Sequence, residues 1–241
     1  MRIECIFLDN GGVITDNSRR GPQYRRLVAE FFAPRFGGAH EIWETANLGA
    51  WPLAWQRFLA RLADWDPSSG NVVDETALCY ADWLRATFAG TGATPPASDQ
   101  ECADLARAAD YWINPQIRAR FPGVEDALLE LGLRYRLFTA SDGFSDPLAD
   151  ALGESVSRFE RLYGPDLVNV PKSAGRSYYD AIFTHAGVDA TNVLVVDDQL
   201  DNLVAAREAG AHTVLVGQPF HTYDGPVITR LADLPALIER L

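Results

Sequence analysis

The hydrophobic positions of this 241-residue chain follow two different patterns along its length. A short apolar run over residues 5–8 ends at Asp9, which predicts a buried strand over residues 3–8 that stops at a carboxylate. From residue 21 to about residue 114, apolar residues recur every three or four positions. That spacing predicts a bundle of amphipathic helices and no strand in this segment.

The helical segment carries signals for its turns and helix ends. Residues 67–70 predict a turn, and Ser98 with Glu101 three positions later predicts a capping box for a helix through Trp112. All six tryptophans lie in this segment. Because large aromatic residues dominate helical cores, packing of the bundle is the first interpretation, and lining of an apolar substrate pocket is the second.

Beyond residue 114, short apolar runs alternate with amphipathic stretches. Strands are predicted at residues 135–139, 167–170, 193–196 and 212–216, and helices at 123–131, 147–152, 177–186, 202–209 and 234–241. Strands that alternate with helices predict an α/β fold with a parallel sheet covered on both faces. The pattern predicts a Rossmann-like doubly wound core of residues 1–16 and 118–241. Residues 17–117 form an all-helical domain inserted after the first strand.

Composition and charge narrow the class of protein. The formal net charge is −12, which argues against non-specific binding to nucleic acid or to an anionic membrane surface. No apolar run approaches the ~18 residues that span a bilayer. The three cysteines have no C-x-x-C spacing, and no charged-then-apolar signal segment opens the chain. We therefore expect free thiols and a cytoplasmic location.

Polar groups follow several predicted strands at the point where each strand ends. They are Asp9, Thr139, Lys172 and the pair Asp197–Asp198. In a parallel sheet these groups meet at one edge, where ligands of open α/β sheets bind. Singly, each has an ordinary explanation, since acids favour helix N-termini and a lysine is often solvated. Lys172 is the only lysine among 21 basic residues, which favours a specific role for its compact charge.

Together, these groups resemble the motifs of the haloacid dehalogenase (HAD) superfamily. Residues 7–13, FLDNGGV, resemble the first motif with Asp9 as nucleophile, and residues 137–141, LFTAS, resemble the second. Lys172, with Tyr178 six residues later, resembles the third motif, and residues 195–202, VVDDQLDN, resemble the fourth. The helical segment lies where this superfamily inserts its helical, C1-type caps.

The resemblance implies a magnesium-dependent phosphatase of a small phosphorylated metabolite. Asp9 would attack phosphorus and form an aspartyl phosphate that water hydrolyses. The implied Mg²⁺ ligands are Asp9, the Gly11 carbonyl and Asp198, with Asp197 in the outer shell. The implied phosphate-binding groups are Asn10, Thr139, Ala140 and Lys172, of which Thr139 and Lys172 also serve catalysis.

One position departs from the pattern of typical phosphatases in this superfamily. They carry a second aspartate two residues after the nucleophile as general acid and base, and this chain has Gly11 there. General acid–base catalysis contributes about 10²–10⁴-fold. Asp142 and Asp16 are the nearest carboxylates in the sequence that could replace this missing aspartate. The alternative interpretation gives each of them an ordinary role in a turn or a helix cap.

Two other functions stay open at this point. A metal-independent 2-haloacid dehalogenase would use Asp9 to attack carbon, but such enzymes carry an aromatic residue at the position of Gly11. A catalytically impaired, ligand-binding HAD protein would keep the fold without the acid. A phosphonatase-like reaction is excluded, because it needs a cap lysine for a Schiff base and residues 17–117 contain none.

Overall fold

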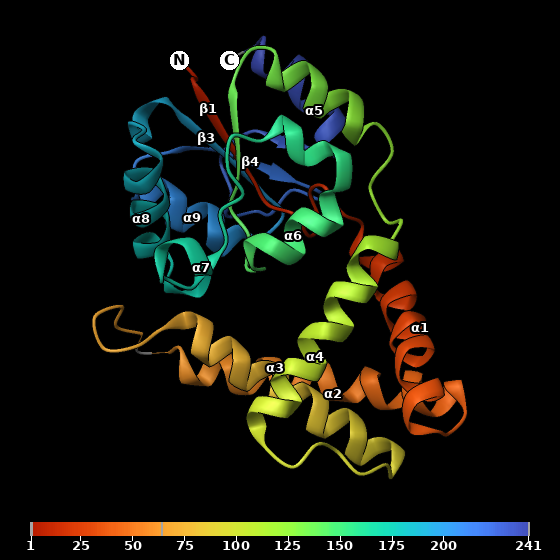
Figure 1. Ribbon diagram of the computed structural model, residues 1–241. Helices are drawn as coiled ribbons and strands as arrows, with labels where there is room; N and C mark the ends of the chain where they lie inside the picture. The colour runs from red at the N-terminus through yellow and green to blue at the C-terminus, as the bar shows by residue number, and fades with distance from the viewer. Residues whose placement is uncertain (1, 64, 241) are drawn as a thin grey trace. The chain divides into compact units, whose positions relative to one another are not determined.

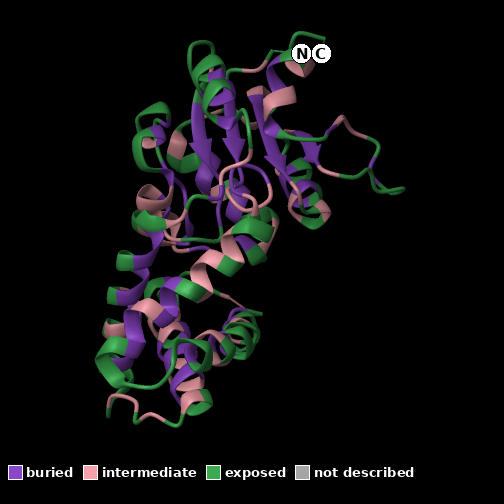
Figure 2. Cartoon of the chain, turned by 90° about the vertical axis from the view of Figure 1, so that its right-hand side faces the viewer, coloured by how far each residue is buried: buried purple, intermediate pink, exposed green. Residues whose placement is uncertain are grey.

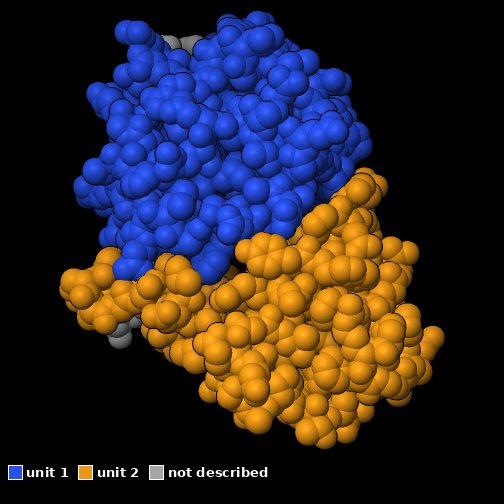
Figure 3. All heavy atoms as spheres, in the orientation of Figure 1, with its two compact units in different colours: residues 1–17, 119–241 blue, residues 18–118 orange. Residues whose placement is uncertain are grey.

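The computed structural model describes residues 2–63 and 65–240. The chain forms two compact units, which are coloured separately in Figure 3. Unit 1 comprises Met1–Asn17 together with Ala119–Leu241, and unit 2 comprises Ser18–Arg118. The interpretation of unit 1 as a catalytic core and unit 2 as its cap stays a prediction, and each unit is described by itself.

Unit 1 is built on a parallel sheet of five strands (Figure 1). In spatial order the strands are β2 (Arg136–Thr139), β1 (Cys5–Leu8), β3 (Val193–Asp197), β4 (His212–Val216) and β5 (Val227–Ile228). Leu8 pairs with Thr139 on one side and with Val196 on the other, so β2, β1 and β3 end close to the same level. The predicted α/β class and parallel sheet are confirmed.

Helices cover both faces of the sheet. They must do so because successive side chains of a strand point to opposite faces, and all four residues of β1 are apolar. Ile6 and Leu8 pack with the cluster on α5 and α6, whereas Cys5 and Phe7 pack with the cluster on α8 and α9. The strands are buried on both sides (Figure 2). The helices of unit 1 are α5 (Val124–Gly132), α6 (Ser145–Leu152), α7 (Pro165–Val168), α8 (Arg176–Ala186), α9 (Leu200–Glu208) and α10 (Leu234–Ile238).

The strand predicted at residues 167–170 is wrong. The apolar pair Leu167–Val168 belongs to the one-turn helix α7, which begins at Pro165 and ends at Asn169 in the left-handed region (φ 53°). Proline is preorganised for a first helical position, and asparagine tolerates the left-handed conformation, so local chemistry overrides the short apolar run. The final helix is also shorter than predicted, and Leu241 lies outside the described residues.

A segment without a predicted strand extends the ladder beside β2. The backbone N–H of Thr139 donates to the Arg161 carbonyl, and that of Ser141 donates to the Tyr163 carbonyl. These bonds hold the residues around Tyr163 against the end of β2, where the sequence places the second motif.

Unit 2 consists of α1 (Asn17–Phe36, whose first residue is assigned to unit 1), α2 (His40–Arg61), α3 (Val72–Thr91) and α4 (Asp99–Ile113). The capping box of Ser98 and Glu101 is confirmed at the start of α4. Trp43 and Trp83 are buried in its core, but Trp51 is 41% exposed, so bundle packing explains only some of the tryptophans. None of the helices in the described chain is long and apolar enough to cross a membrane.

Unit 2 buries a carboxylate in its interior. Asp110 on α4 accepts hydrogen bonds from the Tyr24 hydroxyl (3.0 Å) and the Tyr80 hydroxyl (2.8 Å). Burial raises the pKa of each tyrosine well above its usual value, and the charge of Asp110 raises it further. Both hydroxyls therefore stay protonated and keep donating to Asp110.

Candidate active site

The carboxyl ends of β1, β2 and β3 bring the candidate residues together. Asp9 follows β1, Thr139 is the last residue of β2, and Asp197 is the last residue of β3. All three side chains are buried. The sheet register therefore places in one neighbourhood groups that are far apart in the sequence.

Lys172 joins these strand ends. Its ammonium group donates to Asp9 Oδ1 (2.8 Å), to Asp197 Oδ2 (2.8 Å) and to the Ala140 carbonyl (2.7 Å). The residue is 2% exposed. An ammonium carries three donors, so every donor of Lys172 is already used within the protein. Its position suits holding Asp9 and Asp197 in place better than the predicted direct contact with a phosphate.

The charges of this cluster do not balance. Burial lowers the pKa of Lys172, but Asp9 and Asp197 outweigh it and raise that pKa well above its usual value, so the ammonium stays charged. Burial raises the pKa of Asp9 to about 7, against the lowering effect of Lys172 and with a further rise from Asp197. The pKa of Asp198 is also raised, by burial and then by Asp197. Lys172 thus pairs with two of the three carboxylates, Asp9 and Asp197, and no ion pair is formed by Asp198 among the described residues.

Asp197 and Asp198 have different surroundings. Asp197 also accepts from the Gln199 backbone N–H (2.8 Å), and Asn202 Nδ2 lies 3.1 Å from each of its oxygens. Both Asp197 oxygens are therefore occupied. Asp198 is less buried and lies against Gly12, where a Cβ atom would come within 2.1 Å of Asp198 Oδ2. Gly12 also has a φ of +85°, so glycine is needed there for both space and backbone conformation.

The loop that follows Asp9 closes on itself. The Asn10 carbonyl accepts from the backbone N–H groups of Ile14 and Thr15, and Asn10 Oδ1 accepts from the Thr15 hydroxyl (2.8 Å). Gly12 N–H donates in turn to the Thr15 carbonyl. The amide oxygen of Asn10 therefore orients this loop, and its NH₂ group is the part suited to the predicted contact with phosphate.

Gly11 has a polar neighbour that the sequence did not indicate. A Cβ atom at Gly11 would meet the Asn17 side chain, at 3.0 Å from Nδ2 and 3.2 Å from Oδ1. The carboxamide of Asn17 therefore fills the space where a side chain at position 11 would begin. An aspartate at this position would need Asn17 to move.

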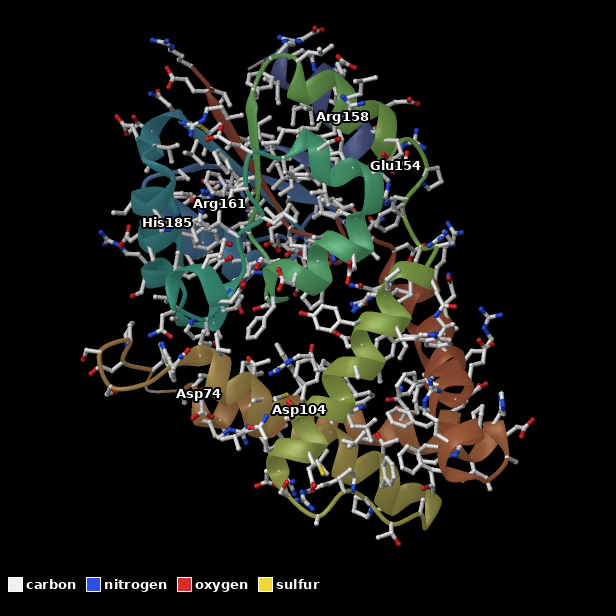
Figure 4. The ribbon with its side chains drawn as sticks, viewed as in Figure 1. Asp74, Asp104, Glu154, Arg158, Arg161 and His185 are labelled. Atoms are coloured by element: carbon white, nitrogen blue, oxygen red, sulfur yellow. The ribbon has the colours of Figure 1, made fainter. Side chains whose placement is uncertain are left out.

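The end of β2 is held by hydrogen bonds to Tyr163. The Thr139 hydroxyl donates to the Tyr163 carbonyl (3.0 Å), so its proton is committed within the protein. The predicted role of Thr139 as a donor to an anion requires this bond to break. The Tyr163 hydroxyl lies 2.9 Å from Nδ1 of His185, which belongs to α8 (Figure 4).

The aromatic residue of the third motif supports the same loop. The Tyr178 hydroxyl donates to the Ser141 carbonyl (3.2 Å), and Ser141 Oγ accepts from the Gly143 N–H (3.0 Å). Next to it, the buried Tyr179 hydroxyl has no hydrogen-bond partner among the described residues. Ser141 belongs to the predicted second motif but was given no role, and Tyr179 was not predicted as part of this region, because a tyrosine on a helix carries no distinguishing pattern there.

The donor set fits a magnesium ion. Asp9, Asp197 and Asp198 each offer an oxygen, and these oxygens lie within 4.8 Å of one another. Mg²⁺ prefers a small number of carboxylates with further oxygen ligands. Since Asp197 is saturated by Lys172, Gln199 and Asn202, the groups left for direct ligation are Asp9 and Asp198, together with the Gly11 carbonyl.

Comparisons with known proteins agree with the fold. Residues 3–210 match the family model of the haloacid dehalogenase-like hydrolases. The defluorinating L-2-haloacid dehalogenase Rha0230 has a similar fold, with a TM-score of 0.72 at 17% identity over 98% of this chain and 95% of that one. None of the curated proteins matches this chain.

Two further solved structures show the same fold. YfnB from Bacillus subtilis, a HAD-hydrolase by name that was crystallised with magnesium, has a TM-score of 0.71 at 16% identity, covering 99% of this chain and 100% of that one. A 2-haloacid dehalogenase from Pseudomonas syringae has a TM-score of 0.67 at 19% identity, covering 99% of each chain. The extent of the family match shows that the chain belongs to the haloacid dehalogenase-like hydrolases.

Proposed function

We propose that this hydrolase is a magnesium-dependent phosphatase that acts on a small phosphorylated metabolite. The observation that carries the proposal is the excess of negative charge at the strand ends. Among the described residues, Lys172 is the one cation that pairs with this group of Asp9, Asp197 and Asp198, which leaves two negative charges when all four groups are ionised. A divalent cation matches that excess and would lower the cost of keeping Asp9 ionised.

In this proposal Asp9 is the nucleophile, and its Oδ1 is fixed by Lys172 (2.8 Å). One Asp9 oxygen then attacks phosphorus, and the resulting aspartyl phosphate is hydrolysed by water. Asp9, Asp198 and the Gly11 carbonyl would hold Mg²⁺, which supplies charge neutralisation for the transferring phosphoryl group. Asp197 and Asn202 orient the ammonium and the carboxylates around it.

Phosphate binding is assigned to the loop ends around the nucleophile. The NH₂ group of Asn10 and the backbone N–H groups beyond Thr139, including that of Ala140, are the candidate donors. The Ala140 N–H donates to the Leu8 carbonyl, so it needs a shift of the β2 end to reach a ligand. Lys172 acts on the phosphoryl group through its charge, since its three donors are already used.

We assign unit 2 as the cap that selects the substrate. A helical lid suits a small molecule, because closure must exclude water around the reacting phosphorus. A cytoplasmic location and the absence of a nucleic-acid partner stay predictions from the sequence.

A 2-haloacid dehalogenase is the second candidate, and one feature of the site favours it. Gly11 brings no acid to the leaving group, and a halide leaves carbon without needing a proton. Several of the similar structures are 2-haloacid dehalogenases, although at 17–19% identity the likeness shows the fold alone. In this reaction Asp9 would attack carbon and form an ester, with no role for a metal.

A single set of assays separates the candidates. The purified chain is assayed on a panel of phosphate esters and 2-haloacids, with Mg²⁺ or with EDTA, beside Asp9→Asn. Phosphate release that EDTA and the Asp9→Asn substitution both abolish supports the phosphatase. Halide release that survives EDTA contradicts it and supports the dehalogenase. Binding of a phosphate ester without turnover of any substrate supports an impaired binding protein.

A further inference from the structure

The reaction proposed above needs a proton donor that position 11 does not supply. An alkoxide leaving group must be protonated as its bond to phosphorus breaks, and the attacking water must lose a proton in the second step. Gly11 has no side chain, and the amide of Asn17 fills the adjoining space. An amide donates and accepts hydrogen bonds but does not transfer a proton at neutral pH. The acid must therefore come from another part of the chain.

The loop after β2 carries a carboxylate in the right neighbourhood. Asp142 lies three residues beyond Thr139, at the same edge of the sheet as Asp9. Of the two residues before it, Ala140 accepts from Lys172 through its carbonyl, and Ser141 accepts from Tyr178. The chain that leads into Asp142 is thus fixed to Lys172 and Tyr178, and the Gly143 N–H after it donates to Ser141 Oγ.

The side chain of Asp142 is free to act. It is exposed, and no hydrogen-bond donor or cation contacts its carboxylate among the described residues. The other acids at this edge are engaged: Asp9 and Asp197 pair with Lys172, and Asp198 lies against Gly12. A carboxylate with no hydrogen-bond partner among the described residues, directly after two anchored residues, suits a group that exchanges protons with substrate and water.

The electrostatic surroundings of Asp142 connect it to the nucleophile. Although its side chain keeps exposed surface, the protein atoms around it raise its pKa, with Lys172 lowering the value and Asp197 raising it. Asp142 in turn is among the charges that act on Asp9 and Lys172. Tyr178 and Tyr179 on α8 are the other titratable groups in this surrounding. A raised pKa is the direction of shift that suits a carboxyl acting as a general acid.

We propose that Asp142 is the general acid and base of this site, replacing the aspartate that the family usually carries at position 11. The inference rests on the proposed phosphatase function. As Asp9 attacks phosphorus, the bond to the leaving oxygen breaks and that oxygen takes the proton of the Asp142 carboxyl. In the second step the Asp142 carboxylate takes a proton from water as the water oxygen attacks phosphorus. The bond between Asp9 and phosphorus then breaks, which releases phosphate and regenerates protonated Asp142.

The test compares two kinds of leaving group with the full chain and Mg²⁺. 4-Nitrophenyl phosphate releases a phenolate that needs no proton, whereas an alkyl phosphate taken from the substrate panel releases an alcohol. Rapid-quench measurement gives the rate of the first burst of product and the amount of phosphoryl-enzyme. The variants are Asp142→Asn, Asp142→Glu and the matched control Asp126→Asn, which removes an exposed carboxylate from α5.

Asp142→Asn should slow the burst on the alkyl phosphate by about 10²–10⁴-fold and leave the burst on 4-nitrophenyl phosphate within about tenfold. Phosphoryl-enzyme should accumulate with the aryl substrate, because the base for the second step is gone. Asp142→Glu should recover part of the alkyl burst, and Asp126→Asn should behave as the wild type.

Two results overturn the role of Asp142 while the phosphatase assignment stands. One is a wild-type burst on alkyl phosphate in Asp142→Asn. The other is an equal loss on both substrates, which indicates a structural role. A different result, in which the wild-type chain forms no phosphoryl-enzyme with either substrate, rejects the phosphatase itself and this inference with it.

Discussion

The two units of this protein each bury a carboxylate, and they stabilise it in different ways. In unit 1, Asp9 faces a fully charged ammonium, Lys172, which it shares with Asp197. In unit 2, Asp110 accepts from two neutral hydroxyls, those of Tyr24 and Tyr80. The first arrangement concentrates charge, and the second satisfies hydrogen bonds without adding any.

The difference distinguishes a candidate reactive centre, around Lys172, from a cluster that serves the packing of helices, around Asp110. Tyr24, Tyr80 and Asp110 come from three helices and complete one another, so nothing in that cluster calls for a ligand. The cluster around Lys172 is incomplete, because Asp9, Asp197 and Asp198 together exceed the single positive charge. A buried polar group is therefore informative about function when its charge is left uncompensated.

The largest expected effect is that of removing the ammonium. Lys172→Met leaves Asp9 and Asp197 buried without a cation, and breaking a buried ion pair costs about 3–5 kcal/mol. Urea unfolding at pH 8 should show that loss, together with loss of activity. Arg176→Met is the control, since its ion pair with Asp180 is exposed and such pairs contribute about 0–1 kcal/mol. Equal costs for the two variants would contradict the account of Lys172.

A smaller effect is expected from the hydroxyls in unit 2. Tyr80→Phe leaves one oxygen of Asp110 without its donor, which costs about 1–3 kcal/mol. The same measurement on Tyr80→Phe combined with Asp110→Asn should show less than the sum of the single losses, because the two groups form one contact. Activity per folded molecule should stay near the wild-type value. Strict additivity would show that the contact contributes nothing.

The tyrosines of unit 2 also predict a loss of stability at high pH. The folded pKa values of Tyr24 and Tyr80 are raised, by burial first and Asp110 next, so the folded chain keeps protons that the unfolded chain loses. Their contribution is complete below the unfolded pKa near 10 and is lost as pH rises toward the folded values. The limiting slope is about 1.4 kcal/mol per pH unit for each tyrosine.

Replacing both tyrosines by phenylalanine should flatten that alkaline slope, measured as the free energy of unfolding between pH 9 and pH 11. Tyr163, Tyr178 and Tyr223 in unit 1 also have raised pKa values, mainly through burial, so part of the slope remains. A slope unchanged by the double substitution would place the alkaline sensitivity in unit 1.

The smallest effect concerns the buried hydroxyl beside the active site. Tyr179 OH has no partner among the described residues, and an unpaired buried polar group costs free energy. Tyr179→Phe should therefore raise the free energy of unfolding by up to about 1 kcal/mol. Tyr178→Phe is the contrast, because that hydroxyl donates to the Ser141 carbonyl and its removal should destabilise. Destabilisation by Tyr179→Phe would mean that the hydroxyl has a partner, such as buried water.

Local chemistry made much of the fold predictable. The apolar run before Asp9 and the capping box of Ser98 and Glu101 each specify a structure within a few residues. The run at residues 167–170 misled because three apolar residues among four suit a strand and a helical turn equally well. Pro165 and Asn169 decided the outcome in favour of the turn.

The sequence predicted which residues form the candidate site better than it predicted the contacts between them. Strand ends in a parallel sheet meet at one edge, so Asp9, Thr139 and Asp197 could be grouped from the sequence. Lys172 follows no strand, and its grouping with them was correct only through its resemblance to the third motif. How the donors are shared depends on tertiary distances. The three bonds of Lys172 and the position of Asn17 beside Gly11 follow from the packed structure and leave no pattern in the sequence.

The most direct test of the central claim is to find the covalent intermediate on Asp9. The chain is mixed with 4-nitrophenyl phosphate and Mg²⁺, quenched in acid, digested and examined by mass spectrometry, beside samples with EDTA and with Asp9→Asn. The account predicts one phosphoryl group on the peptide that contains Asp9, present with Mg²⁺ and absent from both controls. Phosphate release without any adduct on Asp9, or with the same adduct in EDTA, would contradict it.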